Sequence, residues 1–130
     1  MKPNHKLALG ILAGALMSFT ASEAIHARQD KAPSGYLIAE IDVTDPDTYQ
    51  KYAAQVPGTL APYNAQYLVR GGKTTALEGE PPRKRVVVIA FDSVEKAKAW
   101  YDSPAYSAIR PIRQGAAKTR SFIAEGVTPQ

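Results

Sequence analysis

An arginine beside two glycines is the first feature of this sequence that could do chemistry: Arg70 ends a short apolar stretch, and Gly71 and Gly72 follow it directly. A guanidinium and exposed glycine N–H groups together can hold an anion. The alternative is structural, with Arg70 pairing with a carboxylate such as Glu40 or Glu78 and fixing a hairpin that turns at the glycines. We favour the structural interpretation, because the turn alone accounts for both glycines.

Three more polar residues share one face of a predicted strand over 35–43, namely Tyr36, Glu40 and Asp42. If Arg70 reaches these carboxylates, one of them acquires a shifted pKa that suits proton transfer. An ion pair buried across a subunit interface would give the same pattern without catalysis. Strand register does not follow from the sequence, so both hypotheses stay open.

Arg110 and Arg113 lie about one helical turn apart and form a second candidate pair for binding a carboxylate or phosphate. Pairing with Asp102 or Glu125 is the simpler alternative for these two arginines. Together with Asp42 they are the secondary candidates for a ligand site.

The tyrosines are numerous enough to line a pocket for an aromatic or acyl ligand, with their hydroxyls fixing its orientation. The simpler interpretation, which we favour, is that most are core residues at helical spacing whose hydroxyls reach the surface. These tyrosines are Tyr36, Tyr49, Tyr52, Tyr63, Tyr67, Tyr101 and Tyr106.

Several chemistries are excluded by the residue types that the sequence lacks. There is no cysteine, and the two histidines, His5 and His26, lie within the first 27 residues. The rest of the chain therefore offers no thiolate nucleophile, no Cys/His zinc site and no histidine base, and we expect neither metal nor cofactor. The basic run 83–85 has no interleaved aromatic residues, so we interpret it as a solvated loop and expect no nucleic acid partner.

Residues 1–27 have the order of a secretory signal peptide: basic residues, an apolar run over 7–19, and small residues before a cleavage site. The run is shorter than the ~20 apolar residues of a spanning helix, so we expect export to the periplasm or the medium and no stable membrane anchor. The remaining boundaries are predicted to be a linker at 28–34, one domain at 35–126 and a tail at 127–130.

Apolar periodicity and helix-start signals predict the elements that position these residues. Helices are expected to begin at Asp45–Pro46, at Asp92 or Ser93, and at Ser103–Pro104. Pro57 is expected to end or bend the first helix. The predicted strands are 35–43, 66–70, a returning strand 74–78 after a tight turn at 71–73, a central doubly covered strand 85–91, and 119–126.

This order is interpreted as βαββαβ, with two helices against one face of a four-stranded antiparallel sheet. The fold class is therefore α+β, a two-layer sandwich of the ferredoxin-like type. Several blocks of the sequence follow one another in a characteristic order: Gly35-Tyr36, Val43-Thr44-Asp45-Pro46, Tyr49 and Tyr52, Tyr67-Leu68-Val69-Arg70-Gly71-Gly72, Leu77-Glu78-Gly79, Arg85-Val86-Val87, and Trp100-Tyr101 with Ser103-Pro104 and Tyr106. Together these blocks resemble the DUF1330 family of small domains of unknown function.

The resemblance implies a member of the dimeric α/β-barrel superfamily, in which two such sheets associate through the faces that their helices leave bare. Tyr36, Ile38, Glu40 and Asp42 would then face the interior of the barrel. The chain departs from the family pattern at 64–66, where a glycine-rich step is common. It departs again before Phe91, where a glutamate is common and this chain has alanine.

Two functional hypotheses follow. In the first, the protein is an exported homodimer that binds a small organic molecule in its barrel or inter-subunit cleft, with cofactor-free acid/base or oxygenase-like chemistry as one form of that function. Glu40, Arg70 and Tyr36 would supply the carboxylate, the anion-holding group and the hydroxyl, with Gly71 and Gly72 beside them. In the second, it is a non-catalytic dimerisation or interaction module whose polar residues only fix the register.

Overall fold

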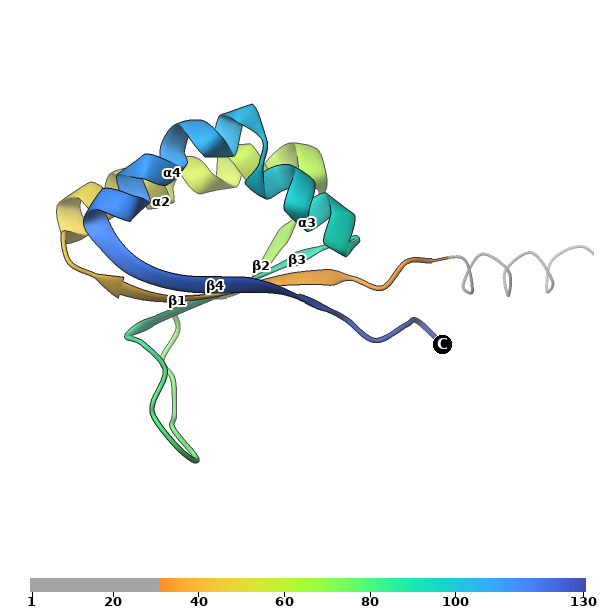
Figure 1. The fold of residues 1–130 in the computed structure, drawn as a ribbon, viewed down its shortest axis with the longest axis horizontal. Helices are drawn as coiled ribbons and strands as arrows, with labels where there is room; N and C mark the ends of the chain where they lie inside the picture. Colours follow the sequence, from red (N-terminus) through yellow and green to blue (C-terminus); the bar gives the residue numbers. More distant parts are fainter. Residues whose placement is uncertain (1–30) are drawn as a thin grey trace, which may run out of the picture. The chain divides into compact units, whose positions relative to one another are not determined.

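The computed structural model describes residues 31–130. The predicted signal peptide at 1–27 and the first part of the predicted linker at 28–34 therefore lie outside the described residues. In chain order the elements are β1 (Gly35–Val43), α2 (Pro46–Leu60), the 3₁₀ turn η1 (Ala61–Tyr63), β2 (Gln66–Arg70), β3 (Arg85–Phe91), α3 (Val94–Tyr101), α4 (Pro104–Ala116) and β4 (Ala117–Glu125) (Figure 1).

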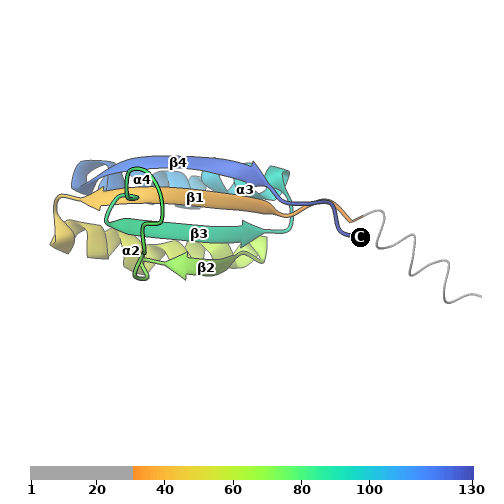
Figure 2. The ribbon, with the colours of Figure 1, turned by 90° about the horizontal axis from the view of Figure 1, so that it is seen from below.

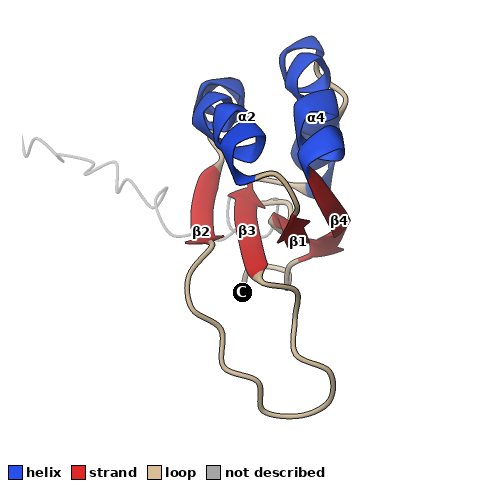
Figure 3. Ribbon diagram, turned by 90° about the vertical axis from the view of Figure 1, so that its left-hand side faces the viewer, coloured by secondary structure: helices blue, strands red, loops and turns tan. Residues whose placement is uncertain are grey.

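The four strands form one antiparallel sheet in the order β2-β3-β1-β4 (Figure 2). Helices α2, α3 and α4 cover the same face of this sheet (Figure 1), and Figure 3 shows α2 and α4 on that face in end view. The α+β, ferredoxin-like fold is thus confirmed. Its second helical region consists of α3 and α4, in agreement with the helix start predicted at Ser103–Pro104.

Strand β1 has two different faces because its residues alternate. Leu37, Ala39 and Ile41 are buried under the helices. On the other face Tyr36 and Ile38 are only partly buried. A strand with one buried apolar face is the pattern that alternation predicts.

Strand β3 lies between β2 and β1, as predicted for a central strand. The expectation that it is covered on both faces is wrong for the described chain. Val87, Ile89 and Phe91 are buried under the helices, whereas the alternate residues Val86 and Val88 lie on the open face and are partly exposed. The continuous apolar run therefore correctly predicted a strand inside the sheet, but within a single chain only one face of that strand is covered.

Helix α2 begins as predicted. Asp45 is its N-cap and accepts a hydrogen bond from the Thr48 backbone N–H, and Pro46 occupies the first turn. Pro57 does not end the helix, because α2 continues through it to Leu60. None of the helices between residues 31 and 130 is long and apolar enough to cross a membrane.

The predicted returning strand at 74–78 is wrong as well. Residues 71–84 form a long exposed loop that leaves the sheet on the side away from the helices (Figures 1 and 3), and β3 itself returns to pair with β2. Gly71 has a φ of 71° and Gly79 a φ of 69°, and Pro81-Pro82 lacks two backbone donors. These breaks flank residues 74–78, which themselves show no apolar alternation and so have no face to bury against the sheet.

The open face of the sheet, formed by residues that point away from the helices, is partly apolar and partly charged. Ile38 lies between Val88 of β3 and Phe122 of β4 in the strand register, and Phe122 is 52% exposed. Glu40 lies opposite Arg120 and forms with it the single salt bridge recorded within residues 31–130. The open face thus combines exposed apolar side chains with a fixed ion pair.

Candidate functional site

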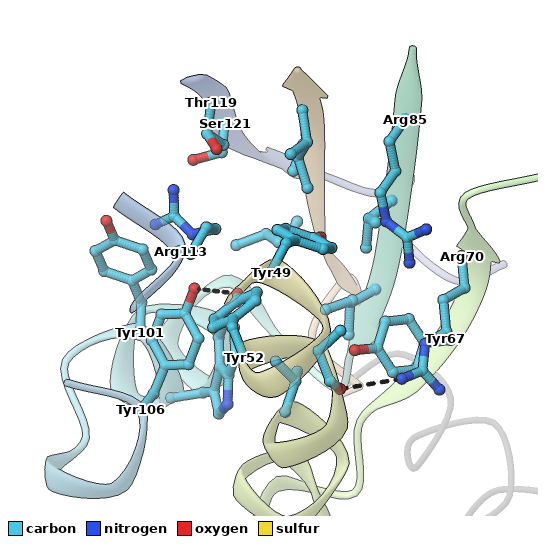
Figure 4. Close-up of a pocket in the computed structure, with 18 residues that line it drawn as sticks. Tyr49, Tyr52, Tyr67, Arg70, Arg85, Tyr101, Tyr106, Arg113, Thr119 and Ser121 are labelled. Carbon is cyan, nitrogen blue, oxygen red and sulfur yellow. Dashed lines mark hydrogen bonds between the residues drawn. The ribbon is translucent and has the colours of Figure 1, made fainter. Parts of the chain in front are cut away.

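A cavity lies between the helices and the covered face of the sheet (Figure 4). Its volume is about 40 Å³ when counted as the space open to the centres of water-sized spheres. That is roughly three times the minimum needed for one water molecule on this measure. Its polar and aromatic lining comprises Tyr49, Tyr52, Tyr67, Arg70, Arg85, Trp100, Tyr101, Tyr106, Arg113, Thr119 and Ser121.

Helix α4 brings the most buried of these charges, Arg113, to the cavity. Arg113 follows Tyr106 by two helical turns and Ile109 by one, so it lies on the buried stripe of the helix. Its side chain is only 7% exposed, yet it forms no salt bridge with a carboxylate in the described chain. Buried charges normally have a partner of opposite charge, so this guanidinium is exceptional.

The hydroxyls of Tyr52 and Tyr106 share a buried hydrogen bond of 2.7 Å beside Arg113 (Figure 4). Burial, and next the neighbouring Tyr106, raise the pKa of Tyr52 above its ordinary value. Burial opposes the charge on Arg113, but Tyr106 and Tyr52 outweigh this effect and raise the pKa of Arg113. This end of the cavity therefore holds a permanent cation and a neutral phenol.

The tyrosine pair is held in place by aromatic packing. The Trp100 ring lies 3.9 Å from the Tyr106 ring, centroid to centroid, and Tyr52 lies 6.3 Å from Tyr106 on the same measure. The Trp100 Nε1–H donates to Thr59 Oγ1 at 3.0 Å, so the indole is both packed and satisfied. These contacts fix the positions of the two hydroxyls.

Arg70 and Arg85 lie at the other end of the cavity, on β2 and β3. Arg70 donates through Nη2 to the backbone oxygen of Ala53 at 3.2 Å, and its guanidinium lies 4.5 Å from the centre of the Tyr67 ring. The Arg85 guanidinium lies 5.4 Å from the centre of the Tyr49 ring. Its Nε is buried and has no hydrogen-bond partner among the described residues.

Strand β4 closes the cavity on the side of Arg113. Thr119 and Ser121 lie opposite Ile41 and Ala39 of β1 and share their helix-facing side. In Figure 4 the Arg113 guanidinium points toward these two hydroxyl side chains. Thr119 Oγ1 is buried and has no hydrogen-bond partner among the described residues.

The cavity lining is therefore rich in donors and poor in bases. It contains three arginines and seven hydroxyl side chains, from five tyrosines, Thr119 and Ser121, but no aspartate, glutamate, histidine or cysteine. Within residues 31–130 no group of three or more His, Cys, Asp or Glu side chains is placed to hold a metal ion. The arrangement can bind and orient an electron-rich group, whereas it offers none of the commonest general bases.

The residues singled out in the sequence separate onto two faces. Arg70 and Arg113 line the cavity. Tyr36, Glu40 and Asp42 lie on the alternate positions of β1, on the open face, so Arg70 does not meet the carboxylates. Glu40 pairs with Arg120 instead, and Asp42 lies opposite Lys118 in the register.

The remaining candidates lie outside the cavity. The Gly71 N–H donates to Val86 O at 2.8 Å and is therefore already engaged, while Gly72 is exposed at the start of the long loop. Arg110 donates to the backbone oxygen of Tyr101 and to Ser107 Oγ, and its guanidinium stacks 4.1 Å from the centre of the Tyr101 ring. Neither Asp102 nor Glu125 pairs with it.

Thr119, Ser121 and Arg85 line the cavity but were not among the sequence candidates. A signal for the first two exists, because both are polar at alternate positions of a strand whose neighbour β1 is apolar at the paired positions. Arg85 was interpreted together with the basic run 83–85, although the predicted strand 85–91 already began at this residue. Five of the seven tyrosines line the cavity, and Tyr36 and Tyr63 do not.

Comparison with solved structures identifies relatives of the fold. A protein of unknown function from Rhodopseudomonas palustris is similar with a TM-score of 0.61 and 15% identity, covering 85% of this chain and 95% of its own. SnoaB, a cofactor-independent oxygenase from Streptomyces nogalater, has a TM-score of 0.54 and 10% identity, covering 76% and 100%. A dimeric ferredoxin-like protein of unknown function from Thermobifida fusca has a TM-score of 0.52 and 17% identity, covering 73% and 92%.

These identities are low, so the three structures support the fold and not a particular activity. Comparison with curated proteins gave no match. The sequence profile described as a domain of unknown function (DUF1330) matches residues 34–127, which is most of the chain. The match covers every helix and strand of the described fold. The chain is therefore a member of the DUF1330 family.

Proposed function

We propose that this protein is a homodimeric binding protein that takes a small organic molecule into the cavity beneath the helices of each protomer. The observation that carries this proposal is a pair of buried donors at opposite ends of one cavity, Arg85 Nε and Thr119 Oγ1, neither of which has a hydrogen-bond partner within residues 31–130. Buried polar groups are nearly always hydrogen-bonded, so unpartnered groups around a cavity favour a bound guest.

Binding is better supported than catalysis. SnoaB, whose fold is similar, is named as a cofactor-independent oxygenase. Catalysis of that kind in the cavity is the alternative to simple binding. Acid/base chemistry of that kind needs a group that accepts a proton from the substrate. The lining offers tyrosines and arginines, and the pKa of Tyr52 is raised rather than lowered, which disfavours the phenolate.

The open face supports the homodimer. It carries exposed apolar side chains, and the Thermobifida fusca protein of similar fold is described as dimeric. A second copy seated there would cover Ile38, Val88 and Phe122 and leave the cavity of each protomer on its own covered side. The signal-like order of residues 1–27 leads us to propose that the protein acts outside the cytoplasm.

The test is a fragment screen by ligand-observed NMR, run on the purified protein and on a variant with a blocked cavity. Ser121→Phe places a large ring at an exposed position of the lining. Thr75→Phe is the matched control, because it puts the same ring in the exposed loop 71–84. We expect fragments that bind the wild type and Thr75→Phe but lose their signal with Ser121→Phe; a screen without such fragments would refute the proposal.

A further inference from the structure

The arginines at the two ends of the cavity differ in their burial and in the contacts that they make. At the β2 end, Arg70 donates to the Ala53 carbonyl and stacks on Tyr67, so part of its hydrogen-bonding capacity is engaged. At the β4 end, Arg113 is only 7% exposed, and it has no carboxylate partner within residues 31–130. Among the three arginines of the lining, Arg113 is the one withdrawn from water, since Arg70 is exposed and Arg85 is only partly buried. Arg113 therefore has the strongest need for a negatively charged partner.

Uncharged donors surround the same guanidinium. The Tyr52 and Tyr106 hydroxyls share one hydrogen bond, and only one of the two protons is used in it, so the pair retains a donor. The buried Thr119 hydroxyl has no partner in the described chain. A guanidinium that points toward Thr119 and lies beside the Tyr52–Tyr106 pair offers the kinds of donors that bind a carboxylate.

We infer that the ligand is a small organic acid whose carboxylate is held by Arg113 together with the Tyr52–Tyr106 pair and Thr119. This inference rests on the proposed function, because it names the ligand class for the same cavity. The carboxylate would supply the negative charge that Arg113 lacks and an acceptor for the Thr119 hydroxyl.

The size of the cavity limits the rest of the ligand. A volume of about 40 Å³ for sphere centres has room for a head group and a short chain, but not for a polycyclic molecule wholly enclosed. Beyond Arg113 the lining continues over Tyr49, Ala39 and Ile41, which are buried and offer a largely apolar surface. A short aliphatic acid fits this arrangement, with its carboxylate at Arg113 and its chain against the apolar part of the lining.

Butyrate and its neutral counterpart butyramide provide a direct test. The two have the same number of non-hydrogen atoms and differ in charge, and Trp100, the single tryptophan of the chain, reports on the site because its ring packs on Tyr106. We expect butyrate to change the Trp100 fluorescence and to bind at least tenfold more tightly than butyramide. Equal affinities for the two compounds would overturn the inference.

The role of Arg113 is tested with Arg113→Gln, and Arg70→Gln removes one charge from the other end of the same cavity. We expect Arg113→Gln to weaken butyrate binding by about ten- to a hundredfold, the usual range for a charge-assisted contact, and to leave butyramide unchanged. Arg70→Gln should weaken butyrate severalfold less. Equal losses in both variants, or none in Arg113→Gln, would contradict the assignment.

Two further variants keep the test decisive if Arg113→Gln does not fold. Arg113→Lys retains the charge and should still prefer butyrate over butyramide, and Thr119→Val should weaken butyrate without unfolding the chain. Unchanged butyrate affinity in Thr119→Val, or equal affinities of Arg113→Lys for the two compounds, would overturn the inference. Inorganic phosphate as tight as butyrate would also contradict it, because the ligand class would then be a free oxyanion.

Failure of this inference is distinguishable from failure of the proposed function. If neutral fragments bind in a way that Ser121→Phe abolishes, while butyrate shows no preference over butyramide, the cavity binds a small molecule but not an acid. If neither the fragments nor butyrate bind in a Ser121-dependent way, the proposed function itself fails.

Discussion

One backbone oxygen connects a proline and an arginine that are distant in the sequence. In an unbroken α-helix the N–H of residue 57 would donate to the Ala53 carbonyl, but Pro57 has no N–H. The Arg70 guanidinium donates to that carbonyl instead, at 3.2 Å. The helix can therefore continue through Pro57 because a side chain of the neighbouring strand replaces the missing donor.

This replacement predicts an energetic coupling between Pro57 and Arg70. Arg70→Met keeps most of the apolar stem but leaves the Ala53 carbonyl without its donor, and should lower the free energy of unfolding by about 1–2 kcal/mol. In a Pro57→Ala background the helix supplies its own donor, so the same substitution should cost about 1 kcal/mol less. Urea unfolding of the wild type, both single variants and the double variant measures the coupling, and strictly additive effects would show that the contact is inconsequential.

The buried phenol of Tyr52 makes stability depend on alkaline pH. Burial and Tyr106 raise its pKa in the folded protein, so above pH ~10 the unfolded chain releases this proton while the folded chain retains it. The free energy of unfolding should then fall by about 1.4 kcal/mol per pH unit from this group alone. Below pH ~10 both states hold the proton, and Tyr52 adds no slope.

Tyr52→Phe isolates that contribution. Denaturant unfolding between pH 9 and 11.5 should give a shallower alkaline slope for Tyr52→Phe than for the wild type. Some slope will remain, because burial also raises the pKa of Tyr67. Parallel slopes in the two proteins would mean that Tyr52 ionises in the folded state as readily as in the unfolded one.

Two of the ligand candidates named from the sequence, Arg70 and Arg113, line the cavity. Tyr36, Glu40 and Asp42 instead lie on the open face, where the alternation of β1 placed them. The sequence left open a contact between Glu40 and Arg70. Their strands, β1 and β2, are separated by β3 in the sheet, and this order is not visible in the sequence. A sequence shows which residues of one strand share a face, but not which residues of another strand join them. The pairing of Glu40 with Arg120, 80 residues away, has no local signal.

At the element scale, the start of β1 and the start of α3 approach so closely that only glycine fits between them. A Cβ added to Gly35 would lie 2.6 Å from the backbone oxygen of Ser93, the N-cap of α3. Backbone atoms at a helix start cannot turn aside as a flexible side chain can. Gly35 therefore lets β1 pass beneath the capped end of α3.

Gly35→Ala should consequently be among the more damaging small substitutions in the chain. We expect a loss of about 2–3 kcal/mol in the free energy of unfolding, because β1 or α3 must shift to remove the clash. Gly58→Ala is the matched control: nothing lies within 4 Å of an added Cβ there, and the site is inside α2. That variant should gain about 0.5–1 kcal/mol.

Thermal and urea unfolding of both variants decide the matter. A wild-type stability for Gly35→Ala would indicate that the β1–α3 contact is looser than described. Destabilisation of Gly58→Ala would instead indicate that the α2 backbone at this point departs from a regular helix.

The elements were predictable where the cause is local and not where it is distant. Asp45 and Ser103 cap helices that begin with proline, and both helix starts were predicted. Pro57 was expected to end or bend α2. The sequence gives no local sign that α2 continues, because the arginine that supplies the missing donor comes from another element. The loop 71–84 was predicted to turn tightly because Gly71-Gly72 is a hairpin signal, but the chain pairs again only at Arg85.

In the molecule as a whole, the two faces of the sheet carry different features. The covered face carries the cavity and its arginines, and the open face carries exposed apolar residues and the Glu40–Arg120 ion pair. The long loop 71–84 leaves the sheet on the open side, with Leu77 91% exposed (Figure 1). If the open face joins two protomers, assembly and ligand binding can be altered independently.

Phe122→Asp tests this separation. A carboxylate at the centre of the proposed interface would have to lose its hydration without a partner, so the dimer should dissociate into monomers. Size-exclusion chromatography with light scattering measures the mass, and Leu77→Asp is the control that adds the same charge on the loop. Butyrate binding should persist in the monomeric Phe122→Asp variant, because the cavity lining belongs to one protomer. A monomeric wild type would contradict the homodimer, and loss of butyrate binding together with the dimer would show that the site needs both copies.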